Sequence, residues 1–304
     1  MYNAPPEIPT RVFAAVPDAL RMRGEKSGWA FGKDHADMHS FLEGPAFDRA
    51  GNLYLVDIPY GRILRVSPAG EFTQVARYDG WPNGLAVHRD GRVFIADHLR
   101  GILALDPSDG RIVPVLDRVR REGLKGVNDL VFARNGDLYF TDQGQTGLQD
   151  PTGRVYRLKP DGQVDCLIDT VPSPNGLVLS PDEKHLFVAV TRANQVWRMP
   201  LHADGSTSKV AAFITLSGGL AGPDGLAMDA EGNLAIAHCG LGTAWLFSRL
   251  GEPLYRMRSA AGLATTNLAY GGPGNRHLYI TESDSGSILV AEMPTPGLPL
   301  YSHR

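Results

Sequence analysis

The sequence is short of the features that mark several large classes of protein. Its 304 residues include only two cysteines, Cys166 and Cys239, too few for a disulfide framework, and neither belongs to a CxxC pair typical of zinc clusters. No stretch approaches the ~20 consecutive apolar residues that a membrane helix requires. The first residues lack the basic segment and apolar run of a secretory signal. These absences predict a cytoplasmic protein without a membrane partner.

An excess of charge of one sign is also lacking. The formal net charge is -3, and basic residues are interspersed among acidic ones, so the chain has no positive field that would collect phosphates. Nucleic acid is therefore not an expected partner. The sequence contains no GxSxG, HExxH or complete GxGxxG motif, which leaves serine-hydrolase, zinc-protease and dinucleotide-binding functions without support.

Glycine and proline, by contrast, are plentiful, with 35 and 22 residues. This composition favours many short strands joined by turns over long helices. One phrase, as in "GPDGLAMDAEGNLAIAH" at 222–238, recurs six times along the chain. The polar residues in the position that the six copies share lie 40 to 49 residues apart; they are Glu43, Asn83, Asn128, Asn175, Asp224 and Asn267.

Each copy of the phrase reads as the start of a four-stranded unit. An apolar run, a Gly or Asn turn and an alternating run form a hairpin, and two further strand-like runs follow. A repeat of this period and content is typical of a β-propeller. The sequence therefore predicts an all-β, single-domain, six-bladed propeller with four antiparallel strands per blade, whose blades start near residues 43, 83, 128, 175, 224 and 267.

The sixth unit ends after its third strand, so its outer strand must come from elsewhere. Residues 11–16, "RVFAAV", have strand character and lie in an N-terminal extension of about 40 residues that precedes the first unit. We expect this segment to complete the last blade, because closure of the ring removes exposed strand edges.

The first strand of each propeller blade lines the central channel, and its first residues lie at one mouth. The six shared polar residues are therefore expected to form a ring there. The residues that close the second strands would form a wider collar around the same mouth; these are Asp57, Asp97, Asp142, Thr191, His238 and Glu282.

The ring residues carry oxygen donors. Glu43, Asn128, Asn175 and Asp224 together suit one hard divalent cation, with calcium as the first expectation and magnesium, manganese and zinc as alternatives. The simpler interpretation is that Asn-Gly and Asp-Gly are ordinary turn formers. That interpretation fits Asn83 and Asn267 in particular, whereas glutamate at 43 is a poor turn former.

Four motifs, "FLEGPAF", "GVNDL", "SPNGL" and "GPDGL", stand in this order at propeller spacing. In this the chain resembles the gluconolactonase and senescence-marker-protein (regucalcin) family, which is itself similar to calcium-dependent phosphotriesterases. The resemblance covers about residues 40 to 294. It implies a catalytic divalent metal held by Glu43, Asn175 and Asp224, with Asn128 as a further ligand or a substrate contact, and it implies opening of a lactone ring.

The resemblance has one departure. Animal members that act on sugar lactones carry an arginine two residues before the asparagine of the "ND" motif. Here that position is Gly126, preceded by Lys125. The expected substrate is a small lactone, and an aldonolactone is the kind that this departure argues against.

Hydrolysis of a lactone needs a polarised carbonyl, which a cation supplies, and a group that takes a proton from water. Asp224 is the predicted catalytic residue, either as general base or as nucleophile. Other polar residues expected around the pocket, each equally explicable as a structural contact, are Asp97, His98, Lys125, Asn128, Asp142, His238 and Asn267.

Other interpretations stay open at this point. A phosphotriesterase would use the same ring, and a non-catalytic scaffold would have the same blades. Residues 143–153 lengthen a loop at the mouth and are a candidate lid. His35, Asp37 and His39 share one face of an extended segment and are a weaker metal-site candidate. The oligomeric state is not indicated.

Overall fold

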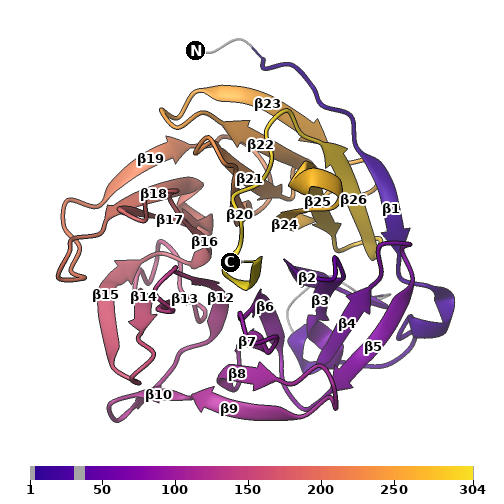
Figure 1. The fold of residues 1–304 in the computed structure, drawn as a ribbon, viewed down its shortest axis with the longest axis horizontal. Coiled ribbons are helices and arrows are strands. Elements are labelled where there is room, and N and C mark those ends of the chain that lie inside the picture. The colour runs from indigo at the N-terminus through magenta and orange to yellow at the C-terminus, as the bar shows by residue number, and fades with distance from the viewer. Residues whose placement is uncertain (1–3, 31–37, 304) are drawn as a thin grey trace.

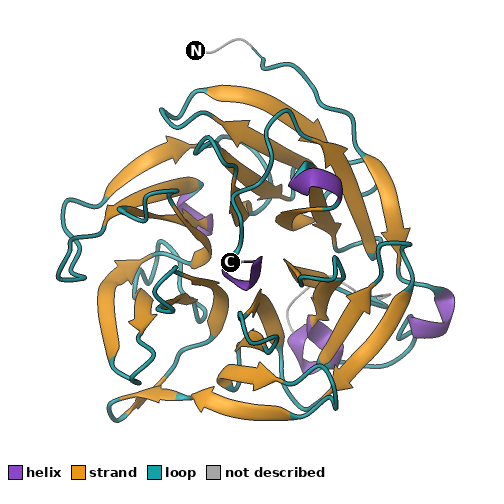
Figure 2. Ribbon diagram, in the orientation of Figure 1, coloured by secondary structure: helices purple, strands orange, loops and turns teal. Residues whose placement is uncertain are grey.

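The computed structural model describes residues 4–30 and 38–303. Its strands form six four-stranded antiparallel sheets that stand as blades around a central axis (Figures 1 and 2). The predicted six-bladed β-propeller is therefore confirmed.

The strands of a blade follow one another from the axis outwards. The first three blades contain β2 (Leu42–Phe47), β3 (Leu53–Asp57), β4 (Arg62–Val66) and β5 (Phe72–Arg77); β6 (Pro82–Val87), β7 (Val93–Asp97), β8 (Gly101–Leu105) and β9 (Ile112–Leu116); β12 (Val127–Phe132), β13 (Leu138–Asp142), β14 (Gly153–Leu158) and β15 (Val164–Val171). The fourth and fifth contain β16 (Pro174–Leu179), β17 (His185–Val190), β18 (Gln195–Pro200) and β19 (Ala211–Thr215); β20 (Gly222–Met228), β21 (Leu234–Cys239), β22 (Thr243–Phe247) and β23 (Pro253–Arg258).

The sixth blade is completed from both ends of the chain. It contains β24 (Thr265–Gly271), β25 (His277–Glu282), β26 (Ser287–Glu292) and, outermost, β1 (Arg11–Ala15), which pairs antiparallel with β26. The predicted closing strand is therefore confirmed. Just before β1, the chain runs along β23, where the Ile8 amide donates to the Arg256 carbonyl at 3.0 Å. The N-terminal segment thus links the fifth blade to the sixth.

Helical structure among the described residues is limited to short 3-10 turns, as the composition predicts. They are η1 (Asp18–Leu20), η2 (Gly28–Ala30), η3 (Ile58–Tyr60), η4 (Thr191–Ala193), η5 (Pro273–Asn275) and η6 (Tyr301–His303), and a small hairpin of β10 (Arg118–Val119) and β11 (Glu122–Gly123) precedes the third blade. None of the helices in the described part of the chain is long and apolar enough to span a membrane.

The first hairpin of most blades turns at a glycine in the left-handed region. Gly51, Gly91, Gly136 and Gly232 have φ between 82° and 93°. A side chain is unfavourable in this conformation, which explains the recurring Gly of the repeat. Glu183 takes the equivalent place in the fourth blade with φ of 56°.

The hydrophobic core lies in layers between adjacent blades. One layer joins Phe47, Leu53 and Leu55 of the first blade to Tyr279 and Val290 of the sixth. Each sheet thus buries both faces, and the ring of layers has no free face once the sixth blade is complete. Burial of this apolar surface is the main stabilising contribution to the fold.

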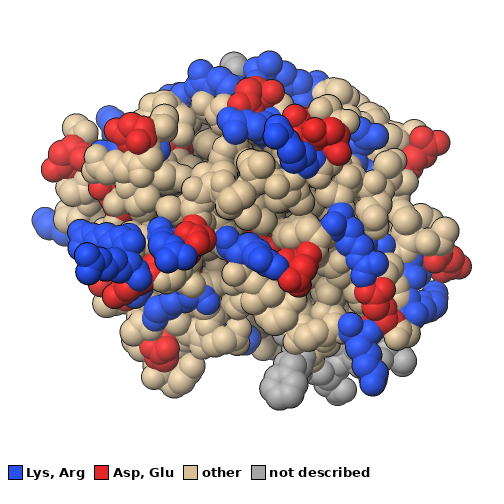
Figure 3. Space-filling view, turned by 90° about the horizontal axis from the view of Figure 1, so that it is seen from below, with Lys and Arg blue, Asp and Glu red and all other residues tan. Residues whose placement is uncertain are grey.

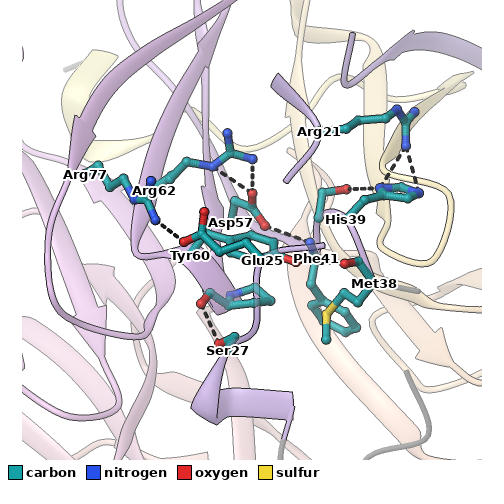
Figure 4. A network of polar contacts seen from close by, with 12 residues as sticks. Arg21, Glu25, Ser27, Met38, His39, Phe41, Asp57, Tyr60, Arg62 and Arg77 are labelled. Atoms are coloured by element: carbon teal, nitrogen blue, oxygen red, sulfur yellow. Dashed lines mark hydrogen bonds and ion pairs between the residues drawn. The ribbon is translucent and has the colours of Figure 1, made fainter. Parts of the chain in front are cut away.

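Buried polar contacts fix the segment that enters the first blade (Figure 4). Asp57, at the end of β3, is fully buried; its Oδ1 accepts the Phe41 N–H at 2.8 Å and its Oδ2 accepts Nε–H of buried Arg62 at 3.0 Å. Phe41 stands two residues before Glu43. These contacts therefore set where Glu43 enters the channel.

The edge of the molecule shown in Figure 3 carries basic and acidic side chains in alternation. Among the described residues several arginines pair with acids, as Arg100 does with Asp79 and Arg154 with Glu122. No field of one sign builds up on this face, as the charge pattern of the sequence predicts.

Closure of the ring can be tested at Phe13 of β1, whose ring packs edge-on against Tyr279 at 5.1 Å. We expect Phe13→Ala to lower the free energy of unfolding by about 2 kcal/mol, because it removes a core contact of the closing strand. Val12→Ala, at a 45% exposed neighbour, is the control and should cost under about 0.5 kcal/mol. Equal losses in chemical denaturation would contradict a closing role for β1.

Candidate functional site

The mouth ring is built by the innermost strands β2, β6, β12, β16, β20 and β24. Three blades have equivalent strand pairs at the same level of the mouth. These pairs are Leu42 with Asp57, Val127 with Asp142 and Thr265 with Glu282. The residue after each of these inner-strand positions, and the residue after Pro82, Pro174 and Pro223 in the other blades, belongs to the ring. The members are Glu43, Asn83, Asn128, Asn175, Asp224 and Thr266.

The sixth member corrects the sequence prediction, which placed Asn267 in this position. Asn267 lies one level deeper, equivalent to Asp129: the backbone N–H of each donates to a threonine hydroxyl, Thr281 and Thr141 respectively. Both Thr266 and Asn267 are polar, so the sequence pattern did not separate them.

A second layer lies directly beneath the ring. Four of its positions are glycines, Gly44, Gly84, Gly176 and Gly225. The other two, Asp129 and Asn267, use the space that the glycines leave. A Cβ on Gly84 would lie 2.5 Å from Asp129 Oδ1, and one on Gly225 would lie 1.9 Å from Asn267 Oδ1. The recurring glycine after the ring residue is therefore needed for close packing at the axis.

Glu43 is 3% exposed and is held from two sides. Its Oε2 accepts the amide of Asn267 at 2.8 Å and the N–H of Gly44 at 2.6 Å. Burial raises the pKa of Glu43 well above its ordinary value, and the negative charge of Asp224 raises it further. Asn267 thus positions a ring carboxylate from below.

Asp224 faces Glu43 from the fifth blade and retains some exposure at the mouth. Its deep setting raises the pKa of the carboxyl to about 8, and the charge of Asp129 acts in the same direction. Hydrogen bonds from the Asn175 amide and the Cys239 thiol oppose this rise only in part. The surrounding protein therefore stabilises the charged form of Asp224 only in part.

Asp129 is a third buried acid at this site. Burial raises its pKa to about 7, and the Leu130 N–H, which donates to Oδ1 at 2.8 Å, offsets part of the effect. Its charge raises the pKa of both Asp224 and Glu43. Three carboxyl groups thus share one region of low polarity, which favours a cation among them.

The donor set fits a hard divalent cation. Asn128 is 4% exposed, its Nδ2 donates to Gln143 Oε1 at 3.1 Å, and its Oδ1 is buried without a hydrogen-bond partner. In the described ranges, no three His, Cys, Asp or Glu side chains form a metal-binding group by themselves. Amide oxygens would therefore have to complete the coordination, and Asn128 Oδ1 and the Asn175 amide oxygen can do so.

Three predicted pocket residues meet between the second and third blades. The Oδ1 of Asp142 accepts the Gly126 N–H at 2.8 Å, so this carboxylate supports the backbone. A Cβ on Gly126 would lie 2.4 Å from Cε1 of His98, so the imidazole fills the space beside the glycine. Exposed Lys125 reaches across to Thr152 Oγ1. His98 and Lys125 are thus placed at the mouth.

His238 is placed differently. It is fully buried, its Nε2 lies 3.1 Å from the Gly218 carbonyl, and its Nδ1 lies 3.3 Å from the indole N–H of Trp245. Burial lowers its pKa, which favours the neutral ring. Both ring nitrogens are engaged by protein groups, so His238 holds the outer part of the fifth blade.

The remaining collar acids also bind backbone. Asp97 accepts the Leu99 and Arg100 N–H groups at 2.8 Å, and Glu282 accepts that of Ala264 at 3.1 Å. These contacts fix the loops at the mouth. Thr191 contributes through its hydroxyl, which donates to the Pro223 carbonyl at 2.8 Å beside Asp224.

Of the second metal-site candidate, His35 and Asp37 lie outside the described residues. His39 lies beside Arg21, whose Nη1 is 2.9 Å from Nδ1 (Figure 4). Burial and then the charge of Arg21 lower the pKa of His39, so the imidazole is a neutral acceptor for the arginine.

Sequence reasoning missed Asp129 and Cys239. Asp129 had a signal, because "GVNDL" carries an acid where four other copies carry glycine. Cys239 closes β21, and its approach to Asp224 depends on strand pairing that the sequence does not display.

Comparison with known proteins places the chain in a family. Residues 41–284 match the family model described as SMP-30/Gluconolactonase/LRE-like region. The chain is 32% identical over 272 residues to the lactonase drp35 of Staphylococcus aureus, covering 82% of this chain and 81% of that protein. It is 32% identical over 260 residues to the lactonase drp35 of Staphylococcus epidermidis, covering 80% and 78%.

Solved structures agree with this assignment. A gluconolactonase of Xanthomonas campestris matches with a TM-score of 0.75 at 26% identity, covering 96% of this chain and 99% of that chain. The calcium-binding protein regucalcin of Agrobacterium tumefaciens matches in fold with a TM-score of 0.78 at 23% identity, covering 98% and 99%. The chain therefore belongs to the SMP-30/gluconolactonase/LRE family, as its four motifs predicted.

Proposed function

We propose that this protein is a divalent-cation-dependent hydrolase that opens a lactone ring. The observation that carries the proposal is the pair of carboxyl groups of Glu43 and Asp224, each with a raised pKa because the protein stabilises its charged form poorly, beside the amides of Asn128 and Asn175. The 32% identity to drp35 lactonases supports the reaction class.

Four ring residues would hold the cation: Glu43, Asn128, Asn175 and Asp224. A bound cation would polarise the lactone carbonyl and stabilise negative charge on its oxygen. Calcium is the proposed ion, because carboxylate and amide oxygens suit a hard cation, with magnesium, manganese and zinc as alternatives.

Asp224 is the proposed catalytic residue. It is the ring carboxylate with access to the mouth, and its raised pKa indicates a group that readily takes a proton. As general base it would accept a proton from the water that attacks the carbonyl carbon, and the ring C–O bond would then break to give a hydroxy acid. As nucleophile its carboxylate would attack the same carbon and the ring C–O bond would break, leaving an anhydride between Asp224 and the opened acid, with the ring oxygen taking up a proton as a hydroxyl; water would then hydrolyse the anhydride to the hydroxy acid and free Asp224.

Other residues have supporting roles in this proposal. Asn267 orients Glu43 through its amide, and Asp129 adds negative charge beneath the ring. His98, Lys125 and Gln143 lie around the mouth on the side of Asn128, where a substrate would be held.

The proposal is tested by assaying a panel of sugar, alkyl and aromatic lactones together with a phosphotriester. The protein would be analysed for metal, stripped with chelator and reloaded with single cations. We expect lactone hydrolysis that disappears on chelation and returns with calcium or an alternative ion. Undiminished hydrolysis after complete removal of metal would contradict the cation-dependent mechanism, and hydrolysis of the phosphotriester alone would contradict the substrate class.

The role of Asp224 can be separated from stability with a matched pair of variants. We expect Asp224→Asn to lower kcat by ~100 to 10,000-fold, because the amide neither accepts a proton nor attacks a carbonyl. The same change at Asp229, which follows the same strand and binds the backbone of Glu231 and Asn233 at the far end, is the control. Turnover by Asp224→Asn equal to that of Asp229→Asn would exclude Asp224 from the chemistry.

The raised pKa of Asp224 also predicts a pH dependence of stability in metal-free protein. Between pH 3.8, which equals its ordinary pKa, and about pH 8, the Asp224 carboxyl of the folded protein keeps a proton that it has released in the unfolded chain. Stability should therefore fall as pH rises from 5 to 8, by at most about 1.4 kcal/mol per pH unit for this group. Asp224→Asn should show a shallower slope in denaturation at pH 5, 6, 7 and 8, and an unchanged slope would be inconsistent with the shift.

A further inference from the structure

Beneath the two polar layers the channel wall becomes apolar. Each innermost strand presents a small apolar side chain three residues after its ring residue; these are Ala46, Ala86, Val131, Val178, Ala227 and Ala269. Their neighbours along the strands, such as Leu85 and Leu177, are buried between blades. Ala86, Val131 and Val178 keep partial exposure at the centre of the molecule, so they border open space. This space is a cavity of about 140 Å³.

The polar layer closes the cavity at its upper end. Asp129 and Asn267 line it there, and both are buried in contacts that also support the ring. They stand between the cavity and Asp224. A molecule in the cavity would therefore occupy a place distinct from a substrate that enters at the mouth.

The C-terminal segment closes the lower end. After β26 the chain crosses the face of the ring that is turned to the viewer in Figure 1 and ends over the axis. Leu298, Leu300, Tyr301 and Ser302 line the cavity from this side. The Leu298 N–H donates to the Met228 carbonyl at 2.9 Å, and the ring of Tyr301 stacks on Phe132 at 5.0 Å.

On the side of the fourth blade the lining includes a partly exposed residue, Glu183. Ser180 and Glu183, from the hairpin between β16 and β17, complete the lining near the surface. Two further contacts hold the C-terminal segment in place. Arg89 lies over the ring of Tyr301 at 4.3 Å, and His303 Nε2 lies 3.1 Å from the Asp48 carbonyl. We expect a guest to enter beside Glu183, on the face opposite the mouth.

The wall decides which molecules fit. Alanine, valine and leucine side chains offer no hydrogen bonds to water, and apolar cavities of ~150 Å³ stay dry and take up benzene or xenon. A charged guest in the middle of the cavity would lose its hydration against the alanines and valines, because the acids of the lining stand only at its upper end and at the hairpin near the surface. The acids above would also repel an anion.

We propose that this channel cavity is a second binding site, for a small uncharged apolar molecule of about the size of one benzene ring. Its occupant lies against the wall of alanines and valines, with the C-terminal tail beneath it. The site is independent of the cation and of the lactone, and it opens on the opposite face.

The test is titration of the full-length protein with benzene, followed by methyl NMR and repeated with xenon. We expect saturable shifts of the Val131 and Val178 methyl groups and none at Val113, which is 38% exposed on the outer strand β9. Val178→Phe fills the cavity and should weaken benzene binding at least about tenfold, whereas Val113→Phe should leave it unchanged. Folding of each variant would be checked by circular dichroism, with Ala227→Leu as a second filling variant.

Absence of saturable shifts, or unchanged affinity in folded filling variants, would overturn the proposal. Shifts that move to the mouth and disappear in Asp224→Asn would overturn it as well, since they would place benzene in the ring. The same titration on metal-free Asp224→Asn should reproduce the wild-type result. Failure of the cavity proposal is thereby distinguishable from failure of the proposed hydrolysis.

Discussion

The concentration of carboxyl groups at the channel axis is the constraint on which the rest of the structure depends. Glu43, Asp129 and Asp224 lie where burial raises the pKa of each. The charge of exposed Arg192 lowers the pKa of Asp224 by less than burial and Asp129 raise it. Such an arrangement is unfavourable for a folded protein unless the charges are paired. Binding of a cation would offset the cost. The buried carboxyl groups that destabilise the metal-free protein are therefore also the groups that would attract the ion.

A propeller can hold such a site because its ring residues come from separate blades that are fixed independently. The Thr141 hydroxyl donates to the carbonyl of Asn175 in the next blade at 2.8 Å, and the Ser283 hydroxyl donates to that of Leu42 across the closure at 2.6 Å. These bonds fix the position of each inner strand relative to that of the next blade. The positions of Glu43 and Asp224 relative to each other therefore depend on the whole ring, including its completion by β1.

Much of the fold was predictable because the sequence of most repeats marks the first hairpin turn with a glycine. Glycines with positive φ stand at the hairpins that the sequence marks, and β1 follows from the missing outer strand of the last unit. The site was less predictable, because a single-residue shift changes where a strand side chain points. Bulges after the first residues of the inner strands set that direction. Hence Thr266 takes the place expected of Asn267. On β21, Cys239 pairs with Gly222 and meets Asp224, whereas His238, which was expected around the pocket, does not.

The order of layers along the channel has a consequence for the chemistry at the mouth. If the wall below Asp129 and Asn267 were polar, water in the channel would solvate the acids from beneath and return their pKa values toward the ordinary range. The layer of alanines and valines, with Leu298 and Leu300 of the C-terminal segment, keeps that side mostly apolar. In such surroundings charges interact more strongly than in water, both with each other and with a cation. The lower half of the channel would thus strengthen binding of the proposed cation by the upper half without contacting it.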